Sequence, residues 1–405
     1  MDTLVLGTGG ASGWPENGCR CASCMRARSA GQHRAPGRVL VADWLEVVPG
    51  KPILSGTGPD STAAAHVERL PGGLDITGAD GDRLLLAGGP GEIPAPPPGT
   101  RPYDIALLDL LASPAQLGEL RARELVHGRT TVAAMYTDHR ISSEEEMARR
   151  CALWGAVQAR DGQVITGPTP APSPRGPHPH RTLIIGGGRS GKSTEAELRL
   201  AAEPQVTYLA AGPFAPARRA RSDQPMGAHG LHPDVPGEPD SQSWTGPGGE
   251  PDAEWERRVA AHRARRPHWW RTVESLDIAG LLRTETGALL VDGIGTWLAA
   301  VLDQAGMWAD EVQPSAAVSA RSSADESRPD PATVVEAAID ELVAAWRQTS
   351  ALVVAVTDQV GSGLVPAFPA GRVFRDQLGW LNQRLAAESE LNLQVTAGRV
   401  TTLPG

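Results

Sequence analysis

The feature that most constrains the fold is a glycine-rich tract at residues 186–193, which reads GGGRSGKS and fits the pattern G-x-x-x-x-G-K-[S/T]. An apolar run, residues 181–185, precedes it, and residues 194–202 follow it with the apolar spacing of a helix. A strand, a glycine-rich loop and a helix in this order form a phosphate-binding loop, because the glycines let backbone N–H groups converge on phosphate oxygens. The tract therefore predicts an α/β domain that binds a nucleotide.

Composition adds weight to one residue of this loop. The chain holds 38 lysines and arginines, and only Lys51 and Lys192 are lysines. Because arginine serves almost everywhere else, Lys192 is predicted to have a specific task, as a compact ammonium between the β- and γ-phosphates. Ser193 is predicted to offer a hydroxyl to Mg²⁺. Residues 288–292, ALLVD, read as a second buried strand, and its terminal Asp292 is a further candidate for Mg²⁺.

The length of 405 residues predicts two domains. We expect an α/β domain at residues 1–165, a proline-rich linker at 166–180, and the nucleotide-binding domain at 181–405. Two stretches of low complexity, near 213–252 and 310–331, are expected to be flexible insertions in the second domain.

Charge and hydropathy exclude some classes of partner. The net charge of −9 argues against nucleic acid, because binding to phosphate backbones needs clustered positive charge. No apolar run approaches the roughly 20 residues that span a bilayer, so no membrane insertion is expected. No tract with the pattern of a signal peptide is found either, and we expect a cytoplasmic protein.

Several ordered motifs after residue 181 resemble one family. The loop at 187–193, the segment 257–274 with its R-x-x-x-H-x-x-x-R-P and W-R-T-V-E patterns, the turn at 360–366 and the helix at 374–386 are similar to those of bifunctional adenosylcobinamide kinase/adenosylcobinamide-phosphate guanylyltransferases. One departure is Gln359, where that family has Glu before the turn.

The resemblance implies a RecA-like P-loop domain with a mainly parallel sheet, two consecutive reactions and a homo-oligomer, namely a trimer. A nucleoside triphosphate, ATP or GTP, phosphorylates adenosylcobinamide in the first reaction. In the second, GTP guanylylates an enzyme histidine, and GMP passes to adenosylcobinamide phosphate. The resemblance places that histidine at His262. It leaves open whether ATP or GTP is the phosphate donor.

The residues around His262 bear on this role independently. His262 shares a predicted helix face with apolar residues, which on its own favours a structural core histidine. Arginines flank it on both sides, however, and they would stabilise charge on a transferring phosphoryl group. An imidazole is neutral near pH 7 and forms covalent intermediates, so His262 is the predicted nucleophile. His268 is the competing candidate and is interpreted as structural.

Guanine recognition calls for a carboxylate that accepts two hydrogen bonds from the base. Glu274 and Asp292 are the two candidates, and the sequence does not decide which of them contacts guanine and which Mg²⁺. The complete predicted nucleotide-binding set is Gly186, Gly187, Gly188, Arg189, Ser190, Gly191, Lys192, Ser193, Leu209, Ala210, Ala211, Arg263, Ala264, Arg265, Arg266, Glu274 and Asp292.

The first 165 residues resemble metallo-β-lactamase-fold hydrolases more weakly, through the opening at 4–10, the cysteine cluster at 19–24 and the segment 134–139. The H-x-H-x-D-H tract of that family is missing, and Gly89 and Tyr136 stand where metal ligands would fall, so this domain is predicted to be a degenerate relative without a hydrolytic centre. A structural Zn²⁺ site is a separate hypothesis, weighed against free thiols on a surface loop. Its ligands would be Cys19, Cys21, Cys24 and, by the resemblance, His139.

Two other functions compete with the bifunctional enzyme. One is a P-loop kinase of another small alcohol, in which His262 is only structural. The other is a nucleotide-gated scaffold protein, against which the intact set of Lys192, Ser193 and Asp292 argues.

Overall fold

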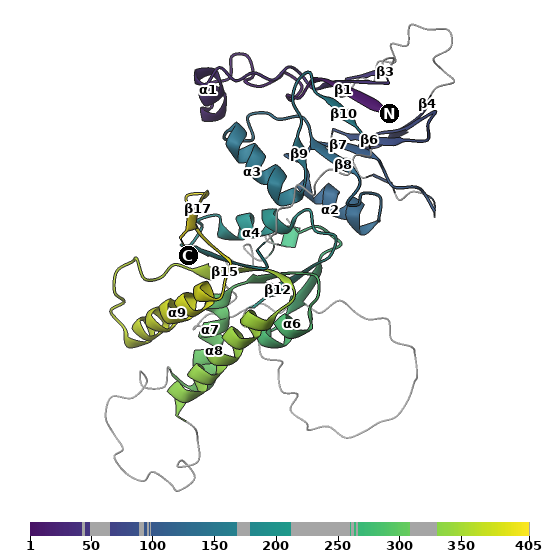
Figure 1. The fold of residues 1–405 in the computed structure, drawn as a ribbon. Coiled ribbons are helices and arrows are strands. Elements are labelled where there is room, and N and C mark those ends of the chain that lie inside the picture. Colours follow the sequence, from purple (N-terminus) through teal and green to yellow (C-terminus); the bar gives the residue numbers. More distant parts are fainter. Residues whose placement is uncertain are drawn as a thin grey trace, which may run out of the picture. The chain divides into compact units, whose positions relative to one another are not determined.

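The computed structural model of the chain contains two units, each described below by itself (Figure 1). Contacts group Met1–Pro179 with Ser193–Val206 as the first unit and His180–Lys192 with Thr207–Gly405 as the second. The residues that the structure describes are 1–42, 45–48, 65–88, 93–94, 97, 99–167, 179–211, 260, 263–264, 266–307 and 330–404. Most of the predicted linker and nearly all of the two predicted insertions lie outside this set.

The first unit holds a four-stranded and a six-stranded sheet. The order β10-β1-β2-β3 describes the smaller, antiparallel sheet, formed by β1 (Asp2–Gly7), β2 (Arg38–Val41), β3 (Leu45–Val47) and β10 (Val164–Thr166). The larger sheet runs in chain order through β4 (Ala65–Leu70), β5 (Gly73–Gly78), β6 (Arg83–Ala87), β7 (Ile105–Leu108), β8 (Thr131–Ala134) and β9 (Val157–Gln158). Its helices are α1 (Ala22–Ser29), α2 (Pro114–Ala122), α3 (Glu144–Trp154) and, from Ser193 onward, α4 (Lys192–Leu200).

Strand β6 shows how the sequence builds the layers of this unit. Its residues are all buried, and neighbours along a strand point to opposite faces of the sheet. Leu84 and Leu86 pack in a core cluster with residues of the smaller sheet, such as Val39. Leu85 packs in a second cluster with helical residues, such as Trp154 of α3. The two sheets therefore share one core, and helices cover the other face of the six-stranded sheet.

The second unit is built on one seven-stranded sheet with the order β13-β12-β14-β15-β11-β16-β17. Its strands are β11 (Arg181–Gly186), β12 (Val206–Ala210), β13 (Arg271–Glu274), β14 (Ala288–Asp292), β15 (Leu352–Asp358), β16 (Leu391–Thr396) and β17 (Arg399–Leu403). Strand β11 pairs in parallel with both β15 and β16, β13 pairs in parallel with β12, and β14 with β15, whereas β17 at the edge pairs antiparallel with β16. The predicted α/β class with a mainly parallel sheet is confirmed for this unit.

The helices of the second unit are α6 (Ile278–Thr284), α7 (Ile294–Ala305), α8 (Pro331–Gln348) and α9 (Pro369–Ala387). Their buried faces join the apolar strands in one core cluster, which includes Trp297 of α7 and Trp346 of α8. Apolar strands of this kind are typical of parallel sheets that are buried on both faces. Among the described residues, no helix combines the length and the apolarity that crossing a bilayer requires.

Candidate functional site

The phosphate-loop motif lies between strand β11 and helix α4 (Lys192–Leu200), as the sequence predicts. Two loop residues, Arg189 and Gly191, have positive φ angles of 58° and 99°. The second of these favours glycine, because side chains rarely adopt that conformation. The backbone N–H of Gly398, between β16 and β17, donates to the Ser190 carbonyl at 2.8 Å and pins the loop. The loop between β11 and α4 is therefore compact, and its backbone folds back on itself.

Lys192 is held over this loop by two oxygen acceptors. Its Nζ lies 2.9 Å from Oδ1 of Asp358 and donates to the carbonyl of Gly187 at 3.2 Å. The Ser190 hydroxyl nearby is buried and has no hydrogen-bond partner among the residues that the structure describes. A buried hydroxyl without a partner is costly, so the loop offers both an ammonium and a donor that suit phosphate oxygens.

Asp358 is a residue that the sequence analysis missed. It ends β15, directly opposite Gly186 in the parallel register, so the carboxylate reaches the end of the phosphate loop. The side-chain amide of Asn382 in α9 donates to its carbonyl at 3.1 Å. A signal was present, because residues 352–358 form an apolar run that ends in a carboxylate, as residues 288–292 do.

Asp292 lies at the carboxyl end of β14, and β15 separates that strand from β11. Its Oδ2 accepts a short hydrogen bond from the Tyr208 hydroxyl. The guanidinium carbon of Arg266 lies 3.4 Å from the centre of the Tyr208 ring, a cation–π contact. Asp292, Tyr208 and Arg266 therefore form one cluster. Whether Asp292 binds Mg²⁺ or guanine stays a prediction.

Glu274 ends β13 and lies opposite Ala210 in the parallel pair with β12. Its Oε1 lies 2.6 Å from Nη2 of Arg263 in an ion pair, and both side chains are exposed. Leu209 and Ala211 are buried, and a contact of either residue with a nucleotide stays a prediction. In an open α/β sheet, ligands bind outside the carboxyl ends of the strands, and the predicted residues of β11 to β14 end at this edge.

The predicted nucleophile His262 lies outside the described residues, as does Arg265. The competing His268 is described, and it is exposed. Its ring meets that of Trp269 edge to face, with the ring centroids 5.3 Å apart. The structural role of His268 and the assignment of His262 as the nucleophile both remain predictions.

Three of the four predicted zinc ligands meet in the first unit. The ligand atoms of Cys19, Cys24 and His139 all lie within 4.8 Å of one another. Sulfur ligands at about 2.3 Å from a tetrahedral zinc lie roughly 3.8 Å apart, so these three residues could hold a metal ion, and the zinc stays a prediction. The fourth, Cys21, has its Sγ 3.4 Å from the Cys24 backbone N–H, and this hydrogen bond lowers the pKa of Cys21 to about 7. The Nδ1 atom of His139 also lies 3.1 Å from Oε2 of Glu16.

Tyr136 occupies the position where the sequence analysis noted a missing metal ligand. The residue is buried and has a φ of 60°, in the left-handed region. Two glycines make room for its ring, because a Cβ on Gly37 would lie 2.5 Å from Cδ1 and one on Gly88 would lie 3.0 Å from Cε2. Burial raises the pKa of the phenol. Gly89, the other departure, lies outside the described residues.

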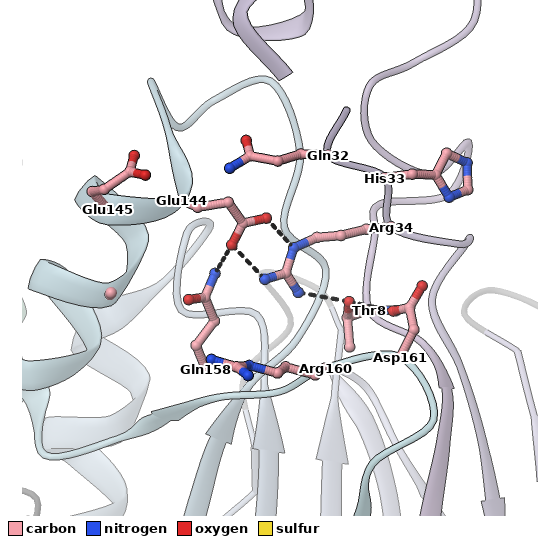
Figure 2. Close-up of a pocket in the computed structure, with 10 residues that line it drawn as sticks. Thr8, Gln32, His33, Arg34, Glu144, Glu145, Gln158, Arg160 and Asp161 are labelled. Atoms are coloured by element: carbon pink, nitrogen blue, oxygen red, sulfur yellow. Dashed lines mark hydrogen bonds and ion pairs between the residues drawn. The ribbon is translucent and has the colours of Figure 1, made fainter. Parts of the chain in front are cut away.

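The first unit also contains a cavity of about 550 Å³, shown in Figure 2. At its centre, the buried Arg34 makes two hydrogen bonds of 2.6 Å to Glu144 and one of 2.7 Å to Thr8. Asp161 accepts from the hydroxyl and the backbone N–H of Thr8. These central charged groups already satisfy one another, so the network ties the residue after β1 to the start of α3 rather than presenting an unpaired charge to a ligand.

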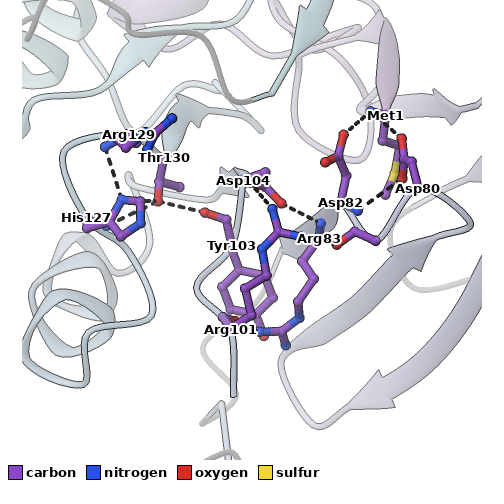
Figure 3. A network of polar contacts seen from close by, with 11 residues as sticks. Met1, Asp80, Asp82, Arg83, Arg101, Tyr103, Asp104, His127, Arg129 and Thr130 are labelled. Atoms are coloured by element: carbon purple, nitrogen blue, oxygen red, sulfur yellow. Dashed lines mark hydrogen bonds and ion pairs between the residues drawn. The ribbon is translucent and has the colours of Figure 1, made fainter. Parts of the chain in front are cut away.

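A second polar network of the first unit lies around the buried Asp104 (Figure 3). Its carboxylate accepts from the backbone N–H of Arg83 at 2.8 Å and from Arg101 at 3.2 Å. The Arg83 guanidinium lies 4.3 Å from the ring centre of Tyr103, whose carbonyl accepts from Thr130. The network ties β6 to the segment before β7 and is structural.

Comparison with known proteins bears on the second unit. The sequence profile of the family described as Cobinamide kinase / cobinamide phosphate guanyltransferase matches residues 241–403. The chain is 30% identical over 231 residues to the Bifunctional adenosylcobalamin biosynthesis protein CobP of Pseudomonas aeruginosa, covering 56% of this chain and 98% of that relative. The chain belongs to this family. It is also 30% identical over 222 residues to the Bifunctional adenosylcobalamin biosynthesis protein CobU of Salmonella typhimurium, covering 53% of this chain and 95% of that protein.

A solved structure, the Zn²⁺-bound PqqB from Methylobacterium extorquens, aligns with 41% of this chain and with its own full length at 11% identity. The TM-score is 0.24, which is too low to assign a fold. The relatives from Pseudomonas aeruginosa and Salmonella typhimurium, in contrast, are covered almost over their full lengths.

Proposed function

We propose that the chain phosphorylates adenosylcobinamide with a nucleoside triphosphate and then transfers GMP from GTP to the product, giving adenosylcobinamide-GDP in cobalamin biosynthesis. The observation that carries the proposal is the family match over nearly the whole length of relatives named bifunctional adenosylcobalamin biosynthesis proteins. The phosphate loop supports it, because Lys192 lies beside Asp358 and the buried Ser190 hydroxyl at the carboxyl edge of the sheet.

In the first step, the aminopropanol hydroxyl of the corrinoid attacks the γ-phosphorus. The bond from that phosphorus to the β–γ bridging oxygen breaks, the nucleoside diphosphate leaves and the hydroxyl proton is lost. Lys192 places its ammonium against the β- and γ-phosphates, where negative charge builds up. Ser193 and Asp292 are the proposed ligands of Mg²⁺, which neutralises phosphate charge when bound. Asp358, whose Oδ1 lies 2.9 Å from the Lys192 Nζ, orients the ammonium.

In the second step, the neutral imidazole of His262 attacks the α-phosphorus of GTP, and pyrophosphate leaves. A phosphate oxygen of adenosylcobinamide phosphate then attacks the same phosphorus, the P–N bond breaks and His262 is restored. Arg263 and Arg266 are proposed to hold the phosphates during the attack, and Glu274 or Asp292 to accept from guanine. Glu274 and Asp292 end β13 and β14, Arg263 pairs with Glu274, and Arg266 lies over the Tyr208 ring of β12, which supports this.

For the first unit we propose a degenerate metallo-β-lactamase-like domain with a structural zinc. Two sheets that share a core, with helices over one outer face, support this architecture. The trio of Cys19, Cys24 and His139 supports the metal. The trimer and the cytoplasmic location that the sequence implies remain predictions.

One experiment tests the proposed function. Purified protein is incubated with adenosylcobinamide, Mg²⁺ and ATP or GTP, and products are identified by mass spectrometry. We expect adenosylcobinamide phosphate first and adenosylcobinamide-GDP only when GTP is present. Phosphorylation of other small alcohols without any corrinoid product would favour the alternative kinase, and nucleotide binding without turnover of any kind would favour the scaffold.

A further inference from the structure

Helix α4 connects the phosphate loop to the first unit. Lys192 is its first residue, and Ser193–Val206 group with the first unit by their contacts. Glu195 follows Lys192 by three residues, in the first turn of the helix, and its carboxylate is only 6% exposed. A buried carboxylate in the turn that follows a phosphate loop needs firm compensation, because unpaired it would repel phosphate.

Arg149 of α3 provides that compensation. Its Nη1 lies 2.8 Å from Oε1 of Glu195 and its Nη2 lies 3.2 Å from Oε2, a two-point pairing of guanidinium and carboxylate. Glu146, one turn earlier in α3, holds the same guanidinium at 2.8 and 3.0 Å. Arg199 of α4 adds a hydrogen bond of 3.0 Å to Oε1 of Glu195. The arginine is thus fixed between two carboxylates rather than left free on the surface.

The far end of α4 is held as well. The indole N–H of Trp154 donates to the Leu198 carbonyl at 2.9 Å, and Arg121 of α2 donates to the Ala202 carbonyl at 2.8 Å. The last carbonyls of a helix lack partners within the helix, so Trp154 caps α4 at Leu198, and Arg121 holds the turn that follows it. At Gly118 in α2, a Cβ would lie 2.6 Å from the Ala201 carbonyl oxygen, so this close approach depends on glycine.

We propose that Arg149 is a positioning residue for nucleotide binding: by holding and neutralising Glu195, it fixes the helix that begins with Lys192. The pair of Arg149 and Glu195 would then act in the proposed kinase reaction through the charge and the position of the first turn of α4. This inference rests on the proposed function for its reaction, but it makes a claim about nucleotide affinity that is measurable without the corrinoid.

The test compares Arg149→Met with Arg150→Met in the full-length protein. Arg150 is a matched control, since it is in the same helix, is similarly exposed (27% against 30%) and pairs with Glu146 but with no part of α4. The Kd of Mg·GTP is measured by calorimetry, together with kcat, the KM of each substrate and the thermal midpoint. We expect Arg149→Met to raise the nucleotide Kd and KM on the order of tenfold, with the corrinoid KM unchanged and Arg150→Met like the parent.

Rescue separates this role from general packing. Glu195→Gln in the Arg149→Met background removes the carboxylate charge that Arg199 alone then faces, and it should recover most of the lost affinity. Arg149→Lys should lose less affinity than Arg149→Met. Equal effects from Arg149→Met and Arg150→Met, or a lower thermal midpoint with unchanged nucleotide affinity, would overturn the proposal. If Arg149→Met does not fold, the comparison of Arg149→Lys with the parent decides, and unchanged affinity there counts against it. A parent protein that binds Mg·GTP but turns over no corrinoid refutes the proposed function alone.

Discussion

Replacing Lys192 with Ala should remove catalysis while leaving the fold almost unchanged. In the free protein, Lys192 contributes one ion pair, 2.9 Å long, to an aspartate whose side chain is 41% exposed, and one hydrogen bond of 3.2 Å to the Gly187 carbonyl. A partly exposed pair is worth about 0–1 kcal/mol and a hydrogen bond about 1 kcal/mol, so the loss in the free energy of unfolding should stay below about 2 kcal/mol. In the transition state, by contrast, the ammonium faces phosphate charge in a loop of backbone donors, and losing one such group costs about 3–4 kcal/mol.

The expected result is a fall in kcat of about 10²- to 10³-fold in both reactions, with the thermal midpoint shifted by no more than a few degrees. Steady-state assays with adenosylcobinamide and with adenosylcobinamide phosphate, alongside scanning calorimetry, measure the two quantities. Lys51→Ala is the control, since it changes the only other lysine of the chain. Undiminished kinase activity in Lys192→Ala would refute the assignment of the phosphate loop. A large loss of stability would refute the small contribution that we assign to the contacts of Lys192 in the free protein.

Three further outcomes are expected. Metal analysis of the purified protein should find about one zinc per chain, and Cys24→Ser or His139→Ala should lower that content, whereas two metals with hydrolytic turnover would contradict a degenerate first domain. The same protein with added Zn²⁺ or Mn²⁺ should show no phosphodiesterase or lactamase activity, so measurable hydrolysis would count against the loss of the centre. Hydrogen bonds from Arg181 lower the pKa of Glu390 to about 2, so the pair stabilises the fold above the unfolded pKa of about 4.3 and loses this contribution as the pH falls toward 2. Glu390→Gln should therefore lower the thermal midpoint at pH 7 but not at pH 2, and an equal shift at both values would refute the pairing.

The phosphate loop could be located from sequence because its information is local. The strand, the glycines and the helix are consecutive, and the structure shows β11 and α4 where the motif predicts them. Asp358 was missed for the opposite reason. It is 166 residues beyond Lys192 in the chain and reaches it only through the pairing of β15 with β11, which no local pattern reveals.

The relation of α4 to the first unit was also beyond sequence reasoning. The motif assigns the helix to the nucleotide domain, but Glu195 and the carbonyls of Leu198 and Ala202 are bound by side chains from α2 and α3. The sequence around a single arginine such as Arg149 does not indicate which carboxylate it pairs with, because the chain contains many arginines. The cysteine cluster was readable from its spacing, and the resemblance placed His139 with it, but only the fold brings its ring near Cys19 and Cys24.

The central claim is that one chain performs phosphoryl transfer without a protein nucleophile and guanylyl transfer through His262. The most direct test incubates the parent, His262→Ala and His268→Ala with α-labelled GTP and Mg²⁺, maps any protein-bound label, and assays phosphorylation of adenosylcobinamide in parallel. The account predicts a label that is stable in base and lost in acid, present in the parent and in His268→Ala, and absent from His262→Ala, which still makes adenosylcobinamide phosphate. A label that persists in His262→Ala, or the loss of both reactions together in a folded His262→Ala protein, would contradict it.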